Sequence, residues 1–367
     1  MTQRPEPRTG HPYHMYEMIQ GQPDAIERVL NEEVDAVRAL ADRIESAERV
    51  HIVGIGTSWH GPLVAEFLLR NVAGRDDARA WNSFEFCSYP PELGPQDLVI
   101  IMSHSGTRVY SSRALEMAKA RGAQTANVTG LESDAKSSLS DVVIRTSIRD
   151  RSSAHTICHT TAMTVLAMVA TELGLRAEKE QAISLQKGLE GLPGFVEAAL
   201  AQEPAIQNWA QQAQDVKRFY FVGWGPNTST AYEVALKIKE AAYLTTEGFQ
   251  LEQYLHGPYV ATAPGTMVTY IAPPGPSRDR LINIIEATRT VGARTVALVE
   301  REDPEISRLV HTAISLPALP EALTPIVYVV ALQLFTYWLA VRAGRSPDTF
   351  RFDDPVYMAA RERYIQF

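Results

Sequence analysis

The sequence has few of the features that mark several large classes of protein. Only two of its 367 residues are cysteines, Cys87 and Cys158, which excludes a disulfide framework and a four-cysteine zinc site. The 35 lysines and arginines are outnumbered by 43 aspartates and glutamates. Such an acidic chain is a poor candidate for wrapping nucleic acid, because that binding depends largely on neutralising phosphates. The first ten residues contain no apolar signal-peptide core. We therefore expect a cytoplasmic protein that binds no nucleic acid.

Long apolar runs are also scarce. Residues 323–341 form a mostly apolar stretch, but Pro325, Gln333 and Thr336 interrupt it and no second such stretch accompanies it. We predict a buried core helix there and no membrane span. Hydrophobic residues make up 45% and charged residues 21% of the chain, as in ordinary globular proteins, and the length is sufficient for two domains.

Short buried strands alternate with helical segments along the whole chain. We predict strands at 50–55, 97–102, 124–128, 141–146, 219–222, 267–271 and 295–299. We predict helices at 24–47, 57–73, 107–121, 154–173, 178–201, 228–243 and 277–290. Strand–turn–helix units of this kind indicate an α/β protein whose parallel sheets are covered by helices.

Three pairs of landmarks indicate an internal repeat. Gly56 and Gly225 each close the first strand of a half, and Gly106 and Gly275 each close the second; both pairs are 169 residues apart. A Gly-Ala pair precedes the third strand of each half, at an offset of 170 residues. We predict two copies of one doubly wound domain. The expected division is an extension at 1–23, subdomain 1 at 24–175, a helical connection at 176–215, subdomain 2 at 216–345 and a tail at 346–367.

A turn rich in hydroxyl groups follows the strand at 97–102 and opens a helix. Its hydroxyl residues are Ser103, Ser105, Thr107 and nearby Ser111. Helix capping would explain one of them, but four favour an anion site at a helix N-terminus, where free N–H groups and the dipole attract phosphate. Gly56-Thr57-Ser58 repeats the arrangement after the preceding strand, so both turns are able to converge on one phosphate. Neither turn is the lysine-containing loop that binds nucleoside triphosphates.

Charged residues recur on one face of the helix predicted at 228–243. Glu233, Lys237 and Glu240 are spaced i, i+4 and i+7, which places them on the same face. Such a face is often simply solvated. This helix, however, follows the first strand of the second half, where ligand clefts open in such folds. A carboxylate held near a lysine is a plausible base for moving a proton between adjacent carbons.

Three histidines are further candidates. His256 lies in the segment 247–256, which we expect to be a loop; it is either a general acid or base or a surface histidine before the Gly257-Pro258 turn. His155 and His159 are spaced i, i+4 with a cysteine between them, which is a possible metal spacing. Because no third ligand is apparent, we favour two ordinary histidines at a helix terminus and predict no metal site.

These motifs, in this order, resemble the sugar isomerase (SIS) domain family. The matching segments are Gly56-Thr57-Ser58, Ser103-x-Ser105-Gly106, the helix from Tyr232 to Glu240, and Leu255-His256-Gly257-Pro258. The likeness is strongest to the isomerase half of glucosamine-6-phosphate synthase and to its deaminase and deglycase relatives, and it spans about residues 16–348. It implies two tandem flavodoxin-like, three-layer SIS subdomains, a hexose 6-phosphate as substrate, a homodimer, and no cofactor or metal.

The resemblance also implies a role for each matching residue. The phosphate would lie on Ser103, His104 and Ser105, with Thr57 and Ser58 beside it. Glu240 matches the family's base for proton transfer between C1 and C2. Glu233 and Lys237 match residues that surround the open-chain sugar. His256 matches the histidine that opens the ring, which in the family comes from the neighbouring subunit.

The sequence also departs from the family pattern. Arg108 occupies the position of the family's threonine, with Thr107 one residue early, so Arg108 is free to contact the phosphate or a second anionic group. His155 and Ile157 replace the serine and lysine of the family's Ala-Ser-Thr-Lys segment. The last lysine of the chain is Lys239, so the tail offers no lysine for the synthase's Schiff base. This favours the deaminase or deglycase branch.

The expected activity is that of a phosphosugar aldose–ketose isomerase. An aminosugar-phosphate deaminase/isomerase and a fructosamine-phosphate deglycase are both compatible with the motifs. Only some 20 residues precede the first predicted helix, so we expect no glutaminase domain in this sequence. The alternative is a non-catalytic SIS sensor that binds a sugar phosphate and regulates a partner; the retained Glu240 and His256 favour catalysis.

Overall fold

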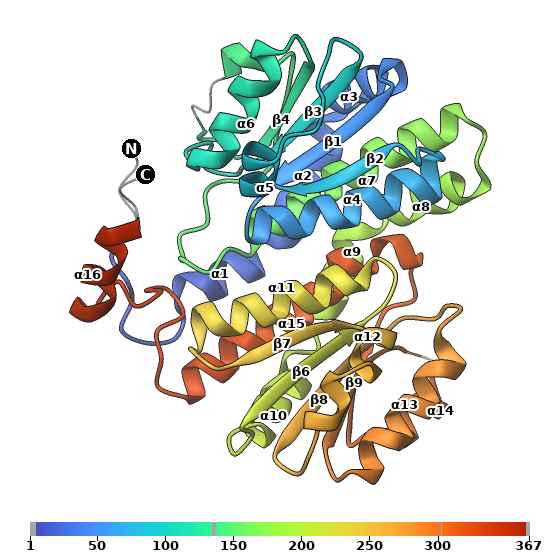
Figure 1. Cartoon of the computed structure of the whole chain (residues 1–367). Helices are drawn as coiled ribbons and strands as arrows, with labels where there is room; N and C mark the ends of the chain where they lie inside the picture. Colours follow the sequence, from blue (N-terminus) through green and yellow to red (C-terminus); the bar gives the residue numbers. More distant parts are fainter. Residues whose placement is uncertain (1–4, 134–136, 302, 365–367) are drawn as a thin grey trace.

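The computed structural model describes residues 5–133, 137–301 and 303–364 and consists of two similar halves (Figure 1). Each half contains one five-stranded parallel sheet with helices on its faces. This confirms the predicted α/β fold with two doubly wound sheets.

The first sheet has the strand order β2-β1-β3-β4-β5. The elements up to the end of this half are α1 (His14–Gln20), α2 (Gln22–Glu32), α3 (Val34–Ser46), β1 (Arg49–Gly54), α4 (Thr57–Ala73), β2 (Ala78–Asn82), α5 (Ser83–Ser88), β3 (Asp97–Met102), α6 (Val109–Ala120), β4 (Gln124–Thr129), η1 (Ser137–Leu139), β5 (Val142–Arg145) and α7 (Ile157–Arg176).

The second sheet has the order β10-β9-β8-β6-β7. The remaining elements are α8 (Glu180–Glu190), α9 (Leu192–Leu200), α10 (Glu203–Gln212), β6 (Arg218–Gly223), α11 (Asn227–Ala241), β7 (Thr246–Gln250), α12 (Leu251–Leu255), η2 (Pro258–Ala261), β8 (Thr266–Ala272), α13 (Arg278–Thr290), β9 (Arg294–Glu300), α14 (Pro304–Leu309), β10 (Thr312–Leu316), η3 (Glu321–Leu323), α15 (Thr324–Arg342) and α16 (Pro355–Tyr364).

The two sheets show the predicted internal repeat. Both have the 2-1-3-4-5 order of flavodoxin-like folds, counted along each half. Individual residues also repeat: each half has a glycine at the end of its first strand, close to the helix that follows. A Cβ on Gly54 would lie 1.8 Å from the carbonyl oxygen of Ser58, and a Cβ on Gly223 would lie 2.2 Å from that of Asn227. Only glycine permits this close approach, and it sets the angle at which α4 and α11 leave their sheets.

Several predicted boundaries were wrong. The segment 247–256, expected as a loop, contains the edge strand β7 and the short helix α12. The edge strand β2 was also missed. Only one residue of β2 and one residue of β7 are buried, so neither strand produces a run of apolar residues in the sequence. The helix predicted at 24–47 is interrupted at Glu33, and the helix predicted at 178–201 is interrupted at Gly191. The strand β10 and the helix α10 were also not predicted.

The core is built around two long apolar helices, α7 and α15. Tyr328, Phe335 and Tyr337 of α15 are fully buried, as predicted for a core helix. By length and composition alone, Glu321–Arg342 could cross a membrane, and so could Ile157–Arg176, a second apolar stretch that was not expected from the sequence. In each helix, however, 89% of the most apolar window is buried inside the protein. Such burial is what a core helix requires.

The segment after α15 is tied to the N-terminal helix α1. Asp348 accepts hydrogen bonds from the backbone N–H groups of His14 (2.9 Å) and Met15 (3.0 Å), which begin α1. We expect Asp348→Ala to lower the free energy of unfolding by about 1–2 kcal/mol, because two N–H groups at a helix start lose their acceptor. Urea denaturation at neutral pH measures this effect. Asp353→Ala, at an exposed position a few residues further on, should change it little.

Candidate active site

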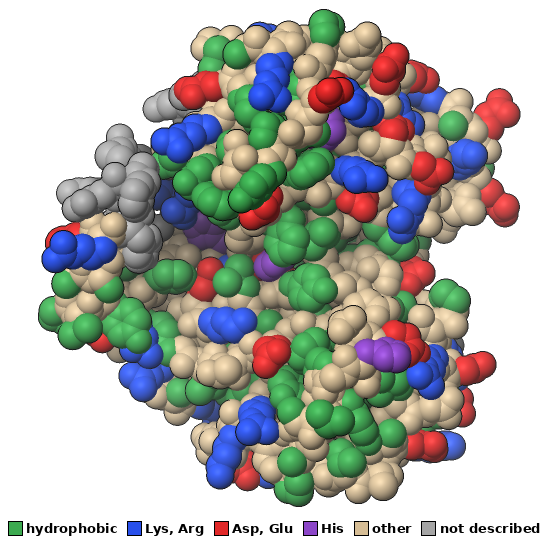
Figure 2. All heavy atoms as spheres, in the orientation of Figure 1, with side chains coloured by type: hydrophobic (Ala, Val, Ile, Leu, Met, Phe, Trp, Pro, Cys, Tyr) green, Lys and Arg blue, Asp and Glu red, His purple; other side chains and the backbone are tan. Residues whose placement is uncertain are grey.

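The candidate site lies where the two halves meet. Helix α4 begins at the carboxyl end of β1, and α11 of the second half packs against it (Figure 1). The side-chain hydroxyl of Ser229 on α11 donates to the backbone carbonyl of His60 on α4 at 2.6 Å. In the space-filling view a recess opens between the halves, and histidine and acidic side chains are visible in it (Figure 2).

The charged face of α11 is buried in this junction. Glu233 is fully buried, and its carboxylate accepts from Thr57 Oγ1 (3.2 Å) and from Nδ1 of His60 (2.5 Å). Lys237 is 1% exposed; its Nζ lies 3.5 Å from Glu233 Oε1 and donates to Glu240 Oε2. Glu240 keeps 14% of its side chain exposed. The predicted i, i+4, i+7 spacing therefore forms one continuous charged array.

The three groups of this array have different protonation behaviour. Burial alone would raise the pKa of Glu233, but Lys237 and two nearby histidines hold it well below its usual range. Burial alone would lower the pKa of Lys237, but the carboxylates of Glu240 and Glu233 raise it. The pKa of Glu240 is raised by burial, which outweighs the opposing effect of Lys237. Glu233 and Lys237 thus stay charged near neutral pH, while Glu240 binds a proton more readily than an ordinary glutamate.

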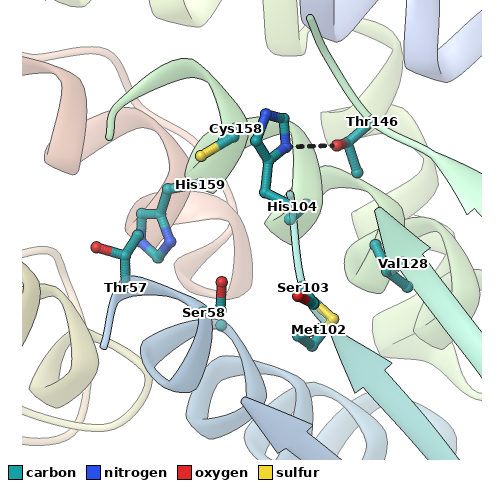
Figure 3. Close-up of a pocket in the computed structure, with 11 residues that line it drawn as sticks. Thr57, Ser58, Met102, Ser103, His104, Val128, Thr146, Cys158 and His159 are labelled. Carbon is teal, nitrogen blue, oxygen red and sulfur yellow. Dashed lines mark hydrogen bonds between the residues drawn. The ribbon is translucent and has the colours of Figure 1, made fainter. Parts of the chain in front are cut away.

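A small cavity adjoins this array on the side of the first sheet. Thr57, Ser58, Ser103 and His104, all predicted to bind phosphate, line it together (Figure 3). The cavity is completed by Gly61, Met102, Val128, Thr146, Cys158, His159 and Ala162. The predicted convergence of the turn after β1 with the turn after β3 is therefore present in the structure.

Two hydroxyl groups in and just after the turn that follows β3 have no hydrogen-bond partner in the described part of the chain. The hydroxyls of Ser103 and Ser111 are buried and make no hydrogen bond there. Ser103, Ser111 and Gly106 also line a second small cavity. Gly106 has a φ of +65°, a backbone conformation that favours glycine. Unpartnered buried donors at the start of α6 suit an anion, because a buried hydroxyl without a partner is costly.

The outer part of the turn is more open. The hydroxyls of Ser105 and Thr107 lie 3.0 Å apart. Arg108 is exposed at the start of α6. His155 lies beside the turn, with its ring centroid 6.2 Å from that of His104, and burial lowers the pKa of His155 to about 3. His155 is therefore a neutral hydrogen-bonding group near the site.

His256 does not join the other site residues within the chain. It follows α12 beyond the edge strand β7, and 75% of its side chain is exposed. Its nearest charged partner is Glu252, at 3.8 Å. A role for His256 in this chain's own cavity therefore has no geometric support, and its action from a neighbouring subunit stays a prediction.

Comparison with known proteins relates this chain to a family. Residues 214–343 match the family model described as SIS domain. The second half of this chain therefore carries a SIS domain. The glutamine–fructose-6-phosphate aminotransferase [isomerizing] of Thermococcus kodakarensis is 31% identical over 345 residues, which cover 93% of this chain and 57% of the relative. The chain thus spans a little over half the length of this curated relative.

Solved structures show that the SIS fold extends over both halves. The C-terminal domain of glucosamine-fructose-6-phosphate aminotransferase from Francisella tularensis superposes with a TM-score of 0.83 at 19% identity, covering 94% of this chain and 99% of that domain. Tagatose-6-phosphate ketose/aldose isomerase from Escherichia coli gives a TM-score of 0.75 at 21% identity, covering 95% and 98%. The resemblance to the SIS family is confirmed, together with the fold that it implied.

Some residues of the candidate site were not predicted from the sequence. His60 lies three residues after Thr57, on the same face of α4, and this spacing was an available signal. His159 faces the cavity, and burial lowers its pKa to about 4. Cys158 also lines the cavity, and Asp150 lies behind it in the loop before α7. No local pattern around Asp150 marks it, because its neighbour His104 comes from a distant part of the chain.

The hydroxyl turn gives a direct test of the anion site. We expect the double variant Ser103→Ala, Ser105→Ala to bind sugar phosphates at least ~10-fold more weakly, because each charge-assisted hydrogen bond contributes about 1.5–3 kcal/mol. Its melting temperature should stay close to that of the wild type, since Ser103 Oγ has no partner in the described structure. Calorimetric titration measures the affinity. Unchanged affinity in a folded variant would place the anion elsewhere.

Proposed function

We propose that this chain is a phosphosugar aldose–ketose isomerase of the aminosugar-phosphate deaminase/isomerase or fructosamine-phosphate deglycase type, acting on a hexose 6-phosphate. The observation that carries the proposal is the buried Glu233–Lys237–Glu240 array beside the hydroxyl turns. Two carboxylates whose environments move their pKa values in opposite directions are a common sign of acid–base chemistry.

The residues divide into binding and proton-transfer groups. Ser103, Ser105 and the N-terminus of α6 would hold the phosphate, with Ser58 on the opposite turn. This places the sugar chain between the turns and α11. Glu240 would take a proton from one carbon of the C1–C2 pair and return it to the other. Lys237 would stabilise the negative charge that develops on oxygen in the enediol-like intermediate.

Glu240 suits the role of base better than Glu233. Glu233 is held as a charged acceptor by Thr57, His60 and Lys237, and its pKa lies well below its usual range, which makes it a weak base. Glu240 has a raised pKa and a partly exposed side chain. A base of higher pKa is more effective in proton abstraction near neutral pH. Glu233 would then position Lys237.

The proposal is tested by product analysis with the purified chain. Fructose 6-phosphate, glucosamine 6-phosphate and a fructosamine 6-phosphate should be supplied separately. Formation of the aldose from fructose 6-phosphate indicates isomerisation. Ammonia released from glucosamine 6-phosphate indicates deamination, and free amine released from the fructosamine phosphate indicates deglycation. Binding of these compounds without any product would contradict catalysis and leave the sugar-phosphate sensor as the function.

We further propose that the active unit is a homodimer in which His256 completes the partner's site. Two observations support action in trans: 75% of the His256 side chain is exposed, and His256 is not among the residues that line the cavity of its own chain. The neighbouring exposed groups, Glu252 and Val260, leave this edge of the second half accessible to another subunit.

Subunit mixing tests the shared site. A Glu240→Gln chain and a His256→Ala chain, each inactive alone, should regain up to about a quarter of wild-type activity after random exchange, because a mixed dimer contains one intact site and one doubly damaged site. Activity should be measured once exchange has been verified with differently labelled chains. If exchange is complete and no activity returns, His256 acts within its own chain. A His256→Ala chain that is active alone would show that His256 has no catalytic role.

A further inference from the structure

Three buried side chains of different chemistry converge beside the hydroxyl turn. They are His104 at the end of β3, Asp150 in the loop after β5, and Cys158 in the first turn of α7. Their ligand atoms, an imidazole nitrogen, a carboxylate oxygen and the thiol sulfur, all lie within 4.8 Å of one another. His104 and Cys158 line the cavity, and Figure 3 shows them on neighbouring segments.

His104 has a buried nitrogen that lacks a partner. Its Nε2 makes no hydrogen bond in the described part of the chain. Its other nitrogen, Nδ1, lies 3.5 Å from the hydroxyl of Thr146. A buried imidazole nitrogen without a hydrogen bond is costly, and a bound ligand would remove that cost. The backbone of His104 is held in place, because its carbonyl accepts from the N–H of Gly130 at 3.0 Å.

Asp150 is held in one orientation by hydrogen bonds from the segment that begins α7. Its Oδ1 accepts from the backbone N–H of Thr156 (2.9 Å) and from the hydroxyl of Thr156 (3.0 Å). Its Oδ2 accepts a longer hydrogen bond from the N–H of Cys158 at 3.2 Å, and the thiol of Cys158 also donates to this carboxylate. These contacts orient the carboxylate from behind, as outer contacts orient the ligands of metal ions.

The charge of the cluster is unbalanced. Asp150 is 1% exposed and forms no ion pair with a lysine or arginine among the residues that the structure describes. A buried carboxylate without a cation is unfavourable. A divalent cation bound to the carboxylate of Asp150 and to the thiolate of Cys158 would bring the total charge of the cluster to zero.

We propose that His104, Asp150 and Cys158 bind a divalent transition-metal ion of the zinc type. Zinc takes nitrogen, oxygen and sulfur ligands together, whereas calcium and magnesium take oxygen ligands and do not favour a thiolate. Ligand atoms around a tetrahedral zinc lie about 3.3–3.6 Å apart, judging from its bond lengths. The three groups therefore need to approach by about 1 Å. Three protein ligands leave a fourth position that is reachable from the cavity.

The argument for this ion does not rest on the proposed isomerase activity. The charged array of α11 contributes no ligand to it, and the ion is tested without any measurement of turnover. Because the ion would lie in the cavity that includes Ser58 and Ser103, metal binding and sugar-phosphate binding are expected to affect each other.

Cobalt(II) is the probe, because a thiolate bound to cobalt gives a charge-transfer band in the near ultraviolet. The full chain, freed of affinity tags and stripped with a chelator, should bind one equivalent of cobalt with this band, and zinc should displace it. Cys158→Ser should abolish the band. Cys87→Ser is the matched control, since Cys87 is the other cysteine and lies half-buried on α5, and the band should be retained.

Two further variants test the other ligands. His104→Ala and Asp150→Asn should each weaken cobalt binding at least ~10-fold, with circular dichroism showing that the fold is retained. Asp150→Asn keeps the shape of the side chain, and if it fails to fold, His104→Ala decides the matter. The proposal is overturned if the wild type shows no band, if the band survives in Cys158→Ser, or if folded His104→Ala binds cobalt as tightly as the wild type.

Discussion

Replacing Glu240 with glutamine is expected to lower turnover by about 10²- to 10⁴-fold while sugar-phosphate binding is retained. The amide keeps the shape of the side chain and can still accept the hydrogen bond from Lys237, but it cannot take a proton from carbon. The hydroxyl turns that we propose bind the phosphate lie on the first half of the chain. Steady-state kinetics together with calorimetric titration separate these two effects.

The pH profile gives a second readout of Glu240. The base must be deprotonated, so kcat/KM should fall as the pH drops through its raised pKa, at a higher pH than an ordinary glutamate would give. The groups that act on Glu240 are Lys237 and Glu233 on α11 and His60 on α4. Glu247→Gln, at an exposed position on β7, is the matched control and should behave as the wild type. Wild-type turnover in Glu240→Gln would refute the assignment.

Replacing Lys237 with methionine is expected to destabilise the fold by about 3–5 kcal/mol, because it leaves two carboxylates without their cation in the junction between the halves. Lys237 is 1% exposed, and Glu233 beside it is fully buried. Lys239→Met removes the same charge two residues along the same helix, at an exposed position, and should change the free energy of unfolding by no more than about 0.5 kcal/mol. Urea denaturation of both variants gives the comparison.

A double variant shows whether Lys237→Met destabilises the protein through lost charge interactions or through lost packing. Adding Glu240→Gln to Lys237→Met removes one of the two uncompensated carboxylates, so the double variant should be more stable than Lys237→Met alone. Additive losses would mean that Lys237 stabilises the protein through packing of its aliphatic stem, without coupling to Glu240.

The central strands were predictable because their burial is encoded locally. All six residues of β3 are buried, and the segment 97–102, an aspartate followed by five apolar residues, predicts that strand with its observed bounds. The edge strands β2 and β7 each bury a single residue, and their identity depends on pairing with β1 and β6. This pairing depends on tertiary contacts, and no local run of apolar residues in the sequence predicts it.

The part of the candidate site that lies on a single helix or a single turn was predictable from the sequence. The spacing of Glu233, Lys237 and Glu240 places them on one face of α11, and the structure puts their charged groups in contact. The contacts of Glu233 with Thr57 and His60 could not be predicted, because they depend on how α4 of one half packs against α11 of the other. The same holds for Asp150, whose neighbours His104 and Cys158 come from separate segments.

Deuterium incorporation tests the central claim most directly. The purified chain is incubated with fructose 6-phosphate in D2O, and the sugar phosphates are followed by NMR. The account predicts deuterium at C1 of fructose 6-phosphate and at C2 of the aldose product, at rates that fall in Glu240→Gln and are unchanged in Glu247→Gln. If sugar phosphates bind, but neither exchange nor interconversion occurs with fructose 6-phosphate or other hexose 6-phosphates, the buried array of α11 does not catalyse proton transfer.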